Sequence, residues 1–423
     1  MFKKITLKNG LRVILVPSQN NSQTVTALAL VGTGSKYETK ETSGISHFLE
    51  HMYFKGTKKR PTSLAVSETL DKLGGTFNAF TSEEYTGYYA KVASSQFETA
   101  IEWVSDIYLN SLLPSREVEK ERKVIMEEIN MYLDAPMLYV GELWKTLLYR
   151  DQPAGWDIAG NKDTVARISR RQLIDYMKSQ YVAHNTIVCL SGGVSSSKAI
   201  ASVKKYFSGI RTSGNRPQPS VFEKQEEPES LIRFKETDQT HLVLGVRTFY
   251  NIFHPQRYAA ELLGAILGGM MSSRMFSEIR EKLGLAYRVR TVAESDADTG
   301  YLATMAGVDN SRVERAITSI LKEYKKISRI RVPLVELKKA KENLKGRISL
   351  NLETSDAKAF FYAGQELLEK KIMTPEEVFK EIDKVSANDI LKAAKDIFKE
   401  DRLNLALIGP FKNKEKFQKL LKL

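Results

Sequence analysis

Short apolar runs open each half of the chain and predict β-strands. Residues 11–16 and 25–31 are dominated by apolar side chains, and shorter apolar or alternating runs occupy residues 232–235 and 242–246. Runs of this length with many β-branched residues are typical of strands. Stretches with helical periodicity follow in both halves, so the pattern predicts an α+β fold in which each half mixes strands with helices.

A polar segment at mid-chain separates the two halves. Residues 211–230 are rich in Gly, Pro, Ser and charged side chains and show no apolar period, which is typical of an exposed linker. A chain of 423 residues is also longer than one hydrophobic core usually supports. We therefore expect one domain over residues 1–210, a linker over 211–230 and a second domain over 231–423.

Two short repeats indicate that the halves arose by tandem duplication. The tripeptide Lys-Leu-Gly at 72–74 recurs at 282–284, which is 210 positions later, and Thr-Gly-Tyr at 86–88 recurs at 299–301, which is 213 positions later. Two matches at nearly the same offset favour an internal repeat over chance. Two unrelated α+β domains are the alternative interpretation.

The segment H-F-L-E-H at residues 47–51 carries the clearest chemistry. On a helix, His47 and His51 are one turn apart on the same face, which Glu50 shares. Zinc binds two neutral imidazoles and a third protein ligand, and the remaining position holds a water whose proton a nearby carboxylate can accept. With five histidines in the chain, the pattern arises by chance on the order of 0.01 times. We expect zinc ligands at His47 and His51 and a general base at Glu50.

The third zinc ligand is not fixed by spacing alone. We expect Thr42 or Ser43 to cap the helix that carries the histidines. A second helix, over residues 115–133, carries Glu121, Glu127 and Glu128, and acids on an otherwise apolar helix face require a partner such as a metal ion. Four further residues are possible ligands in principle: His184, His241, His254 and Cys189.

Composition narrows the classes of partner. The chain is 42% hydrophobic and 27% charged, which fits a globular protein with a sizeable core. The formal net charge is +13, but basic residues alternate with acids, as at residues 117–123, in the manner of solvated helix faces. Neither a zinc-finger spacing nor an aromatic-plus-basic RNA motif is present, so we expect no nucleic-acid partner.

Cysteine content and apolar run length bear on location. The single cysteine, Cys189, rules out an internal disulfide framework and fits a reducing compartment. The N-terminal segment alternates like a strand and lacks the apolar block of a secretory signal. No apolar run approaches the roughly 20 residues of a spanning helix. We expect a cytoplasmic protein that does not enter a membrane.

The motifs together resemble those of the M16, or pitrilysin, family of zinc peptidases. H-x-x-E-H at 47–51 and the acidic segment at 121–128 form the inverted zinc motif of that family, and the short two-domain members include the β-subunit of mitochondrial processing peptidase and bacterial homodimers. Further segments resemble the family along nearly the whole chain: 9–11, 44–57, 74–81, 268–287 and 408–410.

The resemblance implies roles for further residues. It assigns the third zinc ligand to Glu128, with Glu127 as the close competitor, and a supporting role to Glu121. In the second half it matches Arg280 and Tyr287, which in the family reach toward the bound peptide and the zinc. A guanidinium and a phenol can both donate to the oxyanion that forms when water attacks a carbonyl.

The resemblance also implies how the substrate binds. Family members add a peptide as an extra strand at the edge of a sheet, here at Asn78, Ala79 and Phe80, so main-chain hydrogen bonds provide much of the affinity. This mode requires an unfolded or flexible substrate, such as a peptide or a targeting-type presequence. Each half is expected to be a two-layer α/β sandwich, and the halves are expected to form a clamshell chamber.

We therefore expect a Zn²⁺-dependent endopeptidase. Because the zinc motif and the Arg280–Tyr287 pair are on one chain, a self-sufficient homodimer is the simplest assembly. The alternative is a peptide-binding or partner subunit of a heterodimeric M16 protease.

Overall fold

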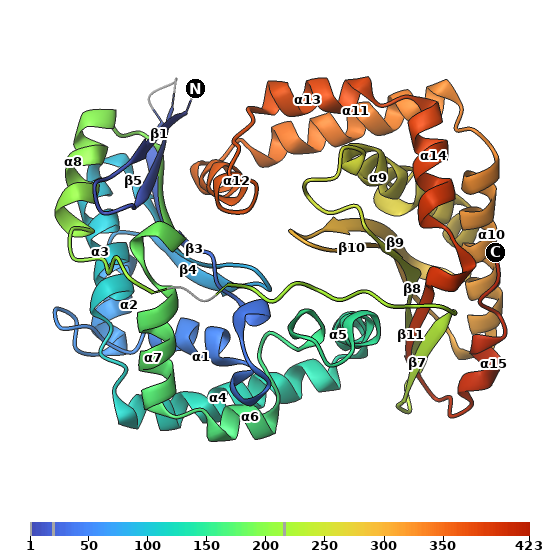
Figure 1. Ribbon diagram of the computed structural model, residues 1–423, viewed down its shortest axis with the longest axis horizontal. Helices are drawn as coiled ribbons and strands as arrows, with labels where there is room; N and C mark the ends of the chain where they lie inside the picture. The colour runs from blue at the N-terminus through green and yellow to red at the C-terminus, as the bar shows by residue number, and fades with distance from the viewer. Residues whose placement is uncertain (1, 19–21, 215–216) are drawn as a thin grey trace. The chain divides into compact units, whose positions relative to one another are not determined.

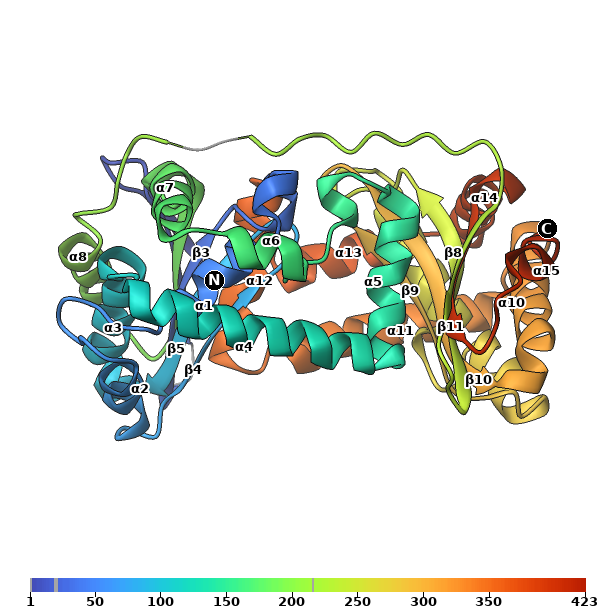
Figure 2. The same ribbon diagram turned by 90° about the horizontal axis from the view of Figure 1, so that it is seen from below.

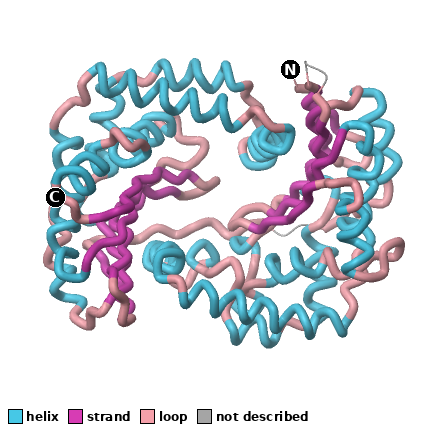
Figure 3. The backbone as a smooth tube through the Cα atoms, turned by 180° about the vertical axis from the view of Figure 1, so that it is seen from behind, coloured by secondary structure: helices cyan, strands magenta, loops and turns pink. Residues whose placement is uncertain are grey.

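Two mixed β-sheets, one in each of two structural units, organise the computed structural model (Figures 1 and 3). The structure describes residues 2–18, 22–214 and 217–423. Unit 1 comprises Met1–Asn130, Trp156–Pro219 and Ser349–Thr374. Unit 2 comprises Met131–Gly155, Ser220–Ile348 and Pro375–Leu423.

The sheet of unit 1 has six strands in the order β1-β2-β6-β3-β5-β4. Their bounds are β1 (Lys3–Thr6), β2 (Arg12–Pro17), β6 (Thr186–Gly192), β3 (Thr24–Val31), β5 (Thr86–Ala93) and β4 (Thr76–Thr81). Strands β2 and β6 are parallel, and the other neighbours are antiparallel. Strand β4 pairs with β5 and forms one edge of the sheet.

The sheet of unit 2 repeats this arrangement with five strands in the order β7-β11-β8-β10-β9. Their bounds are β7 (Glu229–Phe234), β11 (Leu403–Gly409), β8 (Gln239–Thr248), β10 (Gly300–Asp309) and β9 (Ala286–Ser295). Strands β7 and β11 are parallel and the other neighbours antiparallel, as in β2-β6-β3-β5-β4. The predicted fold class, α+β with two similar halves, is confirmed.

The two short sequence repeats occupy matching places in the two sheets. Gly74 and Gly284 both have a positive φ, of 63° and 57°, and lie two residues before β4 and β9. Glycine adopts this left-handed conformation without steric cost. Gly87 and Gly300 lie at the start of β5 and β10. The repeated tripeptides therefore mark the turns and strand starts of a duplicated fold.

Helices cover both faces of the sheet in unit 1 (Figure 1). Helix α3 (Phe97–Asn110) packs against β3 and β5, and α12 (Ser355–Leu368) packs against β3 and β6 from the other side. Because both faces are covered, residues 25–31 of β3 are all buried. The apolar cluster beneath α12 consists of Ile14, Val16, Leu28, Leu30, Ile187, Cys189, Ala359, Tyr362, Ala363 and Leu367.

Helices also cover both faces of the sheet in unit 2 (Figure 2). Helix α5 (Pro136–Tyr149) packs against β7, β8 and β11, with the buried ring of Trp144 in the same apolar cluster as Val243 and Ala406. The other face is covered by α9 (Arg257–Gly264), α10 (Val313–Arg329) and α14 (Ala387–Ile397).

The remaining helices complete the two units. In unit 1 these are α1 (Ile45–Met52), α2 (Ser63–Asp71), α6 (Lys162–Arg167), α7 (Arg170–Gln180) and α8 (Ser196–Tyr206). In unit 2 they are α13 (Pro375–Lys384) and α15 (Lys414–Gln418). Helices α4 (Ser115–Asp134) and α11 (Leu334–Asn351) each contain a boundary between the units. Among the described helices, none is long and apolar enough to cross a membrane.

Each sheet is covered by one helix from the other half of the sequence. Helix α5 precedes the mid-chain linker but belongs to unit 2, and α12 follows the linker but belongs to unit 1. The units therefore differ from the sequence boundaries 1–210 and 231–423 at these two helices. Packing against a sheet face, rather than order along the chain, decides which unit a helix joins.

The linker is attached to unit 2 over its second part. Residues 217–228 form neither helix nor strand, and β7 begins at Glu229; residues 215–216 lie outside the described residues. The Glu223 carboxylate pairs with the buried guanidinium of Arg247 at 3.0 Å, and the Phe222 amide donates to Gln152 Oε1 at 2.7 Å. These contacts assign the linker from Ser220 onward to unit 2.

Candidate metal centre

Helix α1 begins at a glycine that no other residue could replace without strain. Gly44 has φ 94°, and a Cβ there would lie 2.6 Å from the carbonyl oxygen of Ala159. The amides of Gly44 and Ser46 donate to the two carboxyl oxygens of Glu38 at 2.7 and 2.8 Å. Burial raises the pKa of Glu38 to about 8 despite these bonds.

The predicted cap of this helix was therefore wrong. We expected Thr42 or Ser43, but the helix starts directly after Gly44, and its first amides are satisfied by Glu38 from an earlier turn of chain. A carboxyl that arrives from outside the local sequence window leaves no capping pattern for the sequence to display.

Helix α1 separates apolar from polar side chains. Phe48, Leu49 and Met52 are fully buried. The side chains of His47 and His51 lie on the other side and remain 12% and 20% exposed. The buried positions recur at helical spacing, so packing fixes the rotation of the helix and with it the direction of both imidazoles.

The two histidines meet Glu128 of helix α4. His47 Nε2 lies 3.3 Å from His51 Nε2, and Glu128 Oε2 lies 3.6 and 3.5 Å from these two nitrogens. Tetrahedral ligands at about 2.0–2.2 Å from zinc are about 3.3–3.6 Å apart. Among the described residues, these three form the one group of histidines and acids close enough to share a metal ion. Their separations fit zinc.

Glu127, the competing candidate, faces away from the histidines. Its side chain is exposed and accepts a hydrogen bond from Asn130 at 3.2 Å. The apolar face that we expected on this helix is only partly buried, because Ile125 is buried but Val124 is half exposed. The packing of Ile125 and Glu121 orients α4, and this rotation turns Glu128 toward α1.

Glu121 orients His51 from the side opposite to the proposed ligand atom. His51 Nδ1 lies 3.0 Å from Glu121 Oε1, and the other Glu121 oxygen pairs with Lys55 at 2.7 Å. Burial opposes ionisation of Glu121, but the bonds from His51 and Lys55 outweigh it and lower its pKa. An Nδ1–H that donates to a carboxylate leaves the Nε2 lone pair available for a metal.

The two imidazoles differ in charge when no metal is present. Burial, with the positive charge of His51 beside it, lowers the pKa of His47 to about 4. Burial also works against a charged His51, but the bonds to Glu121 and Glu128 outweigh it and raise the pKa of His51 to about 9. A cation is therefore favoured at this cluster of carboxylates, either as a proton on His51 or as a metal ion.

Glu50 lies on the same helix but is held by a different partner. Its Oε2 accepts a hydrogen bond from the Thr81 hydroxyl at 2.6 Å. Burial raises the pKa of Glu50 even though this bond favours the charged form. A carboxylate with a raised pKa beside a metal site is suited to accepting a proton. Thr81 and Lys55 were missed in the sequence; both lie in segments that the family resemblance covers.

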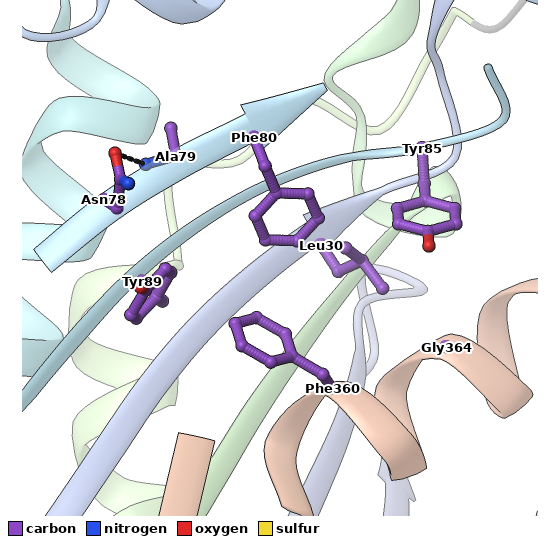
Figure 4. A pocket seen from close by; sticks show the side chains of 8 residues that line it. All are labelled: Leu30, Asn78, Ala79, Phe80, Tyr85, Tyr89, Phe360 and Gly364. Atoms are coloured by element: carbon purple, nitrogen blue, oxygen red, sulfur yellow. Dashed lines mark hydrogen bonds between the residues drawn. The ribbon is translucent and has the colours of Figure 1, made fainter. Parts of the chain in front are cut away.

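The predicted substrate residues lie on the edge strand β4. The ring of Phe80 packs against Phe360 of α12, with ring centroids 5.3 Å apart, on the opposite face from Thr81 and Glu50. Figure 4 shows these two rings on one pocket of about 400 Å³. The pocket is lined by Leu30, Asn78, Ala79, Phe80, Tyr85, Tyr89, Phe360 and Gly364.

Arg280 and Tyr287 lie together in unit 2. Arg280 belongs to a π-helical segment, η7 (Phe276–Lys282), and Tyr287 to β9. The guanidinium carbon of Arg280 lies 4.8 Å from the centre of the Tyr287 ring and 4.6 Å from that of Phe276. The side chain of Tyr287 is 81% exposed. Both donor groups are thus displayed on the surface of unit 2 rather than used in its core.

Comparison with known proteins identifies the family. Residues 13–162 match the family described as Insulinase (Peptidase family M16), and residues 167–344 match the Peptidase M16 inactive domain. The chain belongs to peptidase family M16. It is 36% identical over 417 residues to a Bacillus subtilis (strain 168) protein named "Uncharacterized zinc protease YmxG", which covers 98% of this chain and 99% of that protein.

A further relative and a solved structure are similar to this chain over nearly its whole length. A Rickettsia felis protein named "Uncharacterized zinc protease" is 34% identical over 406 residues, covering 96% of each chain. The fold is similar to the crystal structure of a protease from Helicobacter pylori, with a TM-score of 0.90, 24% identity and coverage of 97% of this chain and 100% of that one.

Proposed function

We propose that this protein is a zinc-dependent endopeptidase that cleaves unfolded peptides or targeting-type presequences. The observation that carries the proposal is the triangle of His47 Nε2, His51 Nε2 and Glu128 Oε2, whose edges of 3.3, 3.5 and 3.6 Å match zinc coordination, with Glu50 on the same helix. The names of the relatives, which call them zinc proteases, support the same metal.

His47, His51 and Glu128 would hold the ion, and Glu121 would keep His51 in the tautomer that binds it. When bound, zinc supplies Lewis acidity, which polarises the scissile carbonyl and makes a water molecule easier to deprotonate. The remaining chemistry belongs to the side chains of the chain itself.

Glu50 is the proposed general base and acid. As the water oxygen bonds to the carbonyl carbon, one water proton moves to the Glu50 carboxylate. The carboxyl group then returns this proton to the amine nitrogen as the carbon–nitrogen bond breaks. The raised pKa of Glu50 supports both steps, since burial makes the carboxylate a better proton acceptor than an exposed one.

The substrate would bind as an added strand on β4. Strand β4 is an edge of the sheet in unit 1, so one side of its backbone is available to a peptide. Asn78, Ala79 and Phe80 would pair with the peptide backbone. Side chains of an added strand alternate between faces, so every second residue of the peptide would meet the apolar pocket of Phe80 and Phe360. This favours peptides with a large apolar residue at such a position.

Arg280 and Tyr287 are proposed to stabilise the oxyanion. Their stacking and the exposure of Tyr287 support a role outside the core of unit 2. We further propose a homodimer, because both sets of catalytic residues are on one chain, and a cytoplasmic location, which the single buried cysteine, Cys189, supports.

The experiment that tests the proposal is cleavage of a mixed peptide library by the zinc-loaded protein, read by mass spectrometry. We expect cleavage by the wild type and none by Glu50→Gln, which should retain its zinc. Cleavage by Glu50→Gln at the wild-type rate would contradict the role of Glu50.

The metal ligand is tested separately from activity by two neighbouring variants. Glu128→Gln should lower the bound zinc well below one ion per chain, whereas Glu127→Gln should leave it unchanged, because Glu128 lies close to both histidines and Glu127 bonds to Asn130 instead. The reverse result would reassign the third ligand.

The alternative, a partner subunit of a heterodimeric protease, predicts that the purified chain alone binds peptides without cleaving them. Measuring the mass of the purified protein in solution together with its activity separates the two assemblies.

A further inference from the structure

We propose that Thr81 is a positioning residue that fixes the general base relative to the strand on which the substrate lies. The inference deepens the proposed function and rests on it. It concerns one hydrogen bond, from the hydroxyl of Thr81 on β4 to the carboxylate of Glu50 on α1.

The bond restrains one of the two Glu50 oxygens. The Thr81 hydroxyl donates to Glu50 Oε2 at 2.6 Å, a length typical of a strong bond to a charged acceptor. No hydrogen bond to the other oxygen, Oε1, is found among the residues that the structure describes. The bond therefore restrains rotation of the carboxylate and leaves Oε1 to accept a proton from the attacking water.

The strand side of the bond is itself rigid. Thr81 is the last residue of β4 and pairs with Thr86 of β5. The turn between them is closed by Ser82, whose amide and hydroxyl both donate to the Tyr85 carbonyl at 2.9 and 3.0 Å. The Thr86 hydroxyl donates to the Thr33 carbonyl at 2.8 Å. Thr81 thus has a fixed backbone from which to hold Glu50.

This arrangement gives the base and the substrate a common reference. A peptide added to the edge of β4 is aligned by the backbone of that strand, and Thr81 aligns Glu50 to the same strand. A misplacement of about 1 Å at a reacting group lowers the rate on the order of 100-fold. Loss of the hydroxyl should therefore slow the chemical step and leave peptide binding unchanged.

Three substitutions test the role of the hydroxyl. Thr81→Val keeps the shape and removes the donor, Thr81→Ala removes the donor without adding volume, and Thr81→Ser keeps the donor. On a peptide that the wild type cleaves, we expect the Val and Ala variants to lower kcat about 10- to 100-fold, with KM within about twofold. Thr81→Ser should return kcat to within about threefold of the wild type.

A matched control isolates the position from the chemistry of the substitution. Thr240 on β8 also donates from a strand to a side chain elsewhere, Asn310 Oδ1, at 2.7 Å, but it belongs to unit 2. Thr240→Val should therefore leave kcat unchanged. Zinc content and the unfolding temperature of all variants should stay close to those of the wild type.

The outcomes separate this inference from the proposed function. Wild-type kcat in Thr81→Val, a Ser variant as slow as the Val variant, a rise in KM without a fall in kcat, or loss of zinc would each overturn the positioning role and leave the peptidase proposal standing. A wild type that cleaves no peptide would overturn both.

Discussion

The two units share one sheet topology, but they differ in the segment that follows β3 in unit 1 and β8 in unit 2. In unit 1 the segment between β3 and β4 carries helix α1 with His47, Glu50 and His51. In unit 2 the segment between β8 and β9 carries α9, which contains no histidine and buries alanines and leucines instead. Duplication of the fold has therefore not duplicated the candidate metal centre.

The two units also differ in the side chains at positions that the internal repeat relates. The offset of 210 that relates the Lys-Leu-Gly tripeptides relates Leu70 to Arg280 and Phe77 to Tyr287. Leu70 is fully buried, and the Phe77 ring packs 5.1 Å from that of Trp103. Tyr287 is instead 81% exposed. Equivalent positions thus support the core in one unit and display polar donors in the other.

We expect the largest effect when the chain is cut after residue 210, the end of the first domain predicted from the sequence. A fragment of residues 1–210 lacks α12, so the sheet face that packs against Tyr362 and Leu367 becomes exposed. Burial of these and the neighbouring side chains contributes about 5 kcal/mol or more. We expect the fragment to lose cooperative thermal unfolding and to bind a hydrophobic dye.

Adding back α12 provides the control for that fragment. A synthetic peptide of residues 349–374 supplied in trans should restore cooperative unfolding, because unit 1 takes this segment from the second half of the sequence. A fragment 1–210 that unfolds cooperatively by itself would show that the exchanged helix is dispensable.

Replacing one histidine in each unit should show that zinc binding and activity depend on unit 1 and not on the histidine of unit 2. His51→Ala removes a proposed ligand in unit 1, so we expect loss of bound zinc and a fall in kcat/KM of about 1000-fold or more. His241→Ala changes a half-buried histidine on β8 of unit 2 and should leave zinc content and activity unchanged. Elemental analysis and peptide cleavage measure both; equal effects would place the metal dependence elsewhere.

A smaller loss of zinc binding is expected when the residue that orients His51 is changed. Glu121→Gln keeps the volume but loses the charge that holds His51 Nδ1 and Lys55. Loss of such an orienting partner typically lowers metal affinity 10- to 100-fold. Competition with a zinc chelator of known affinity measures the change. An unchanged affinity would mean that burial alone orients the imidazole.

The smallest effect is expected from unit 2. Tyr287→Phe removes one exposed donor that packs on Arg280, so kcat should fall about tenfold while zinc content and stability stay unchanged. Steady-state kinetics on the same peptide checks this. If kcat is unaffected, the exposed ring has another role.

The sequence by itself determined the parts that depend on local spacing. His47, Glu50 and His51 lie on one short helix, so their common face follows from helical geometry. The two repeated tripeptides, each with a glycine at a turn or strand start, identified the duplication. Apolar runs located strands β2, β3, β7 and β8 of the two sheets, and helical periodicity followed them in both halves, which is why the α+β class could be predicted.

Only the tertiary structure decided what depends on packing between distant segments. Glu127 and Glu128 differ by one residue, about 100° of rotation on a helix, and the packing of α4 turned Glu128 toward the histidines. Glu38 and Thr81 contact α1 from other segments of the chain, so no local sequence pattern predicted their hydrogen bonds to it. The sequence also could not predict that α5 packs in unit 2 and α12 in unit 1. The pattern of an amphipathic helix shows which of its faces is buried but not which sheet it covers.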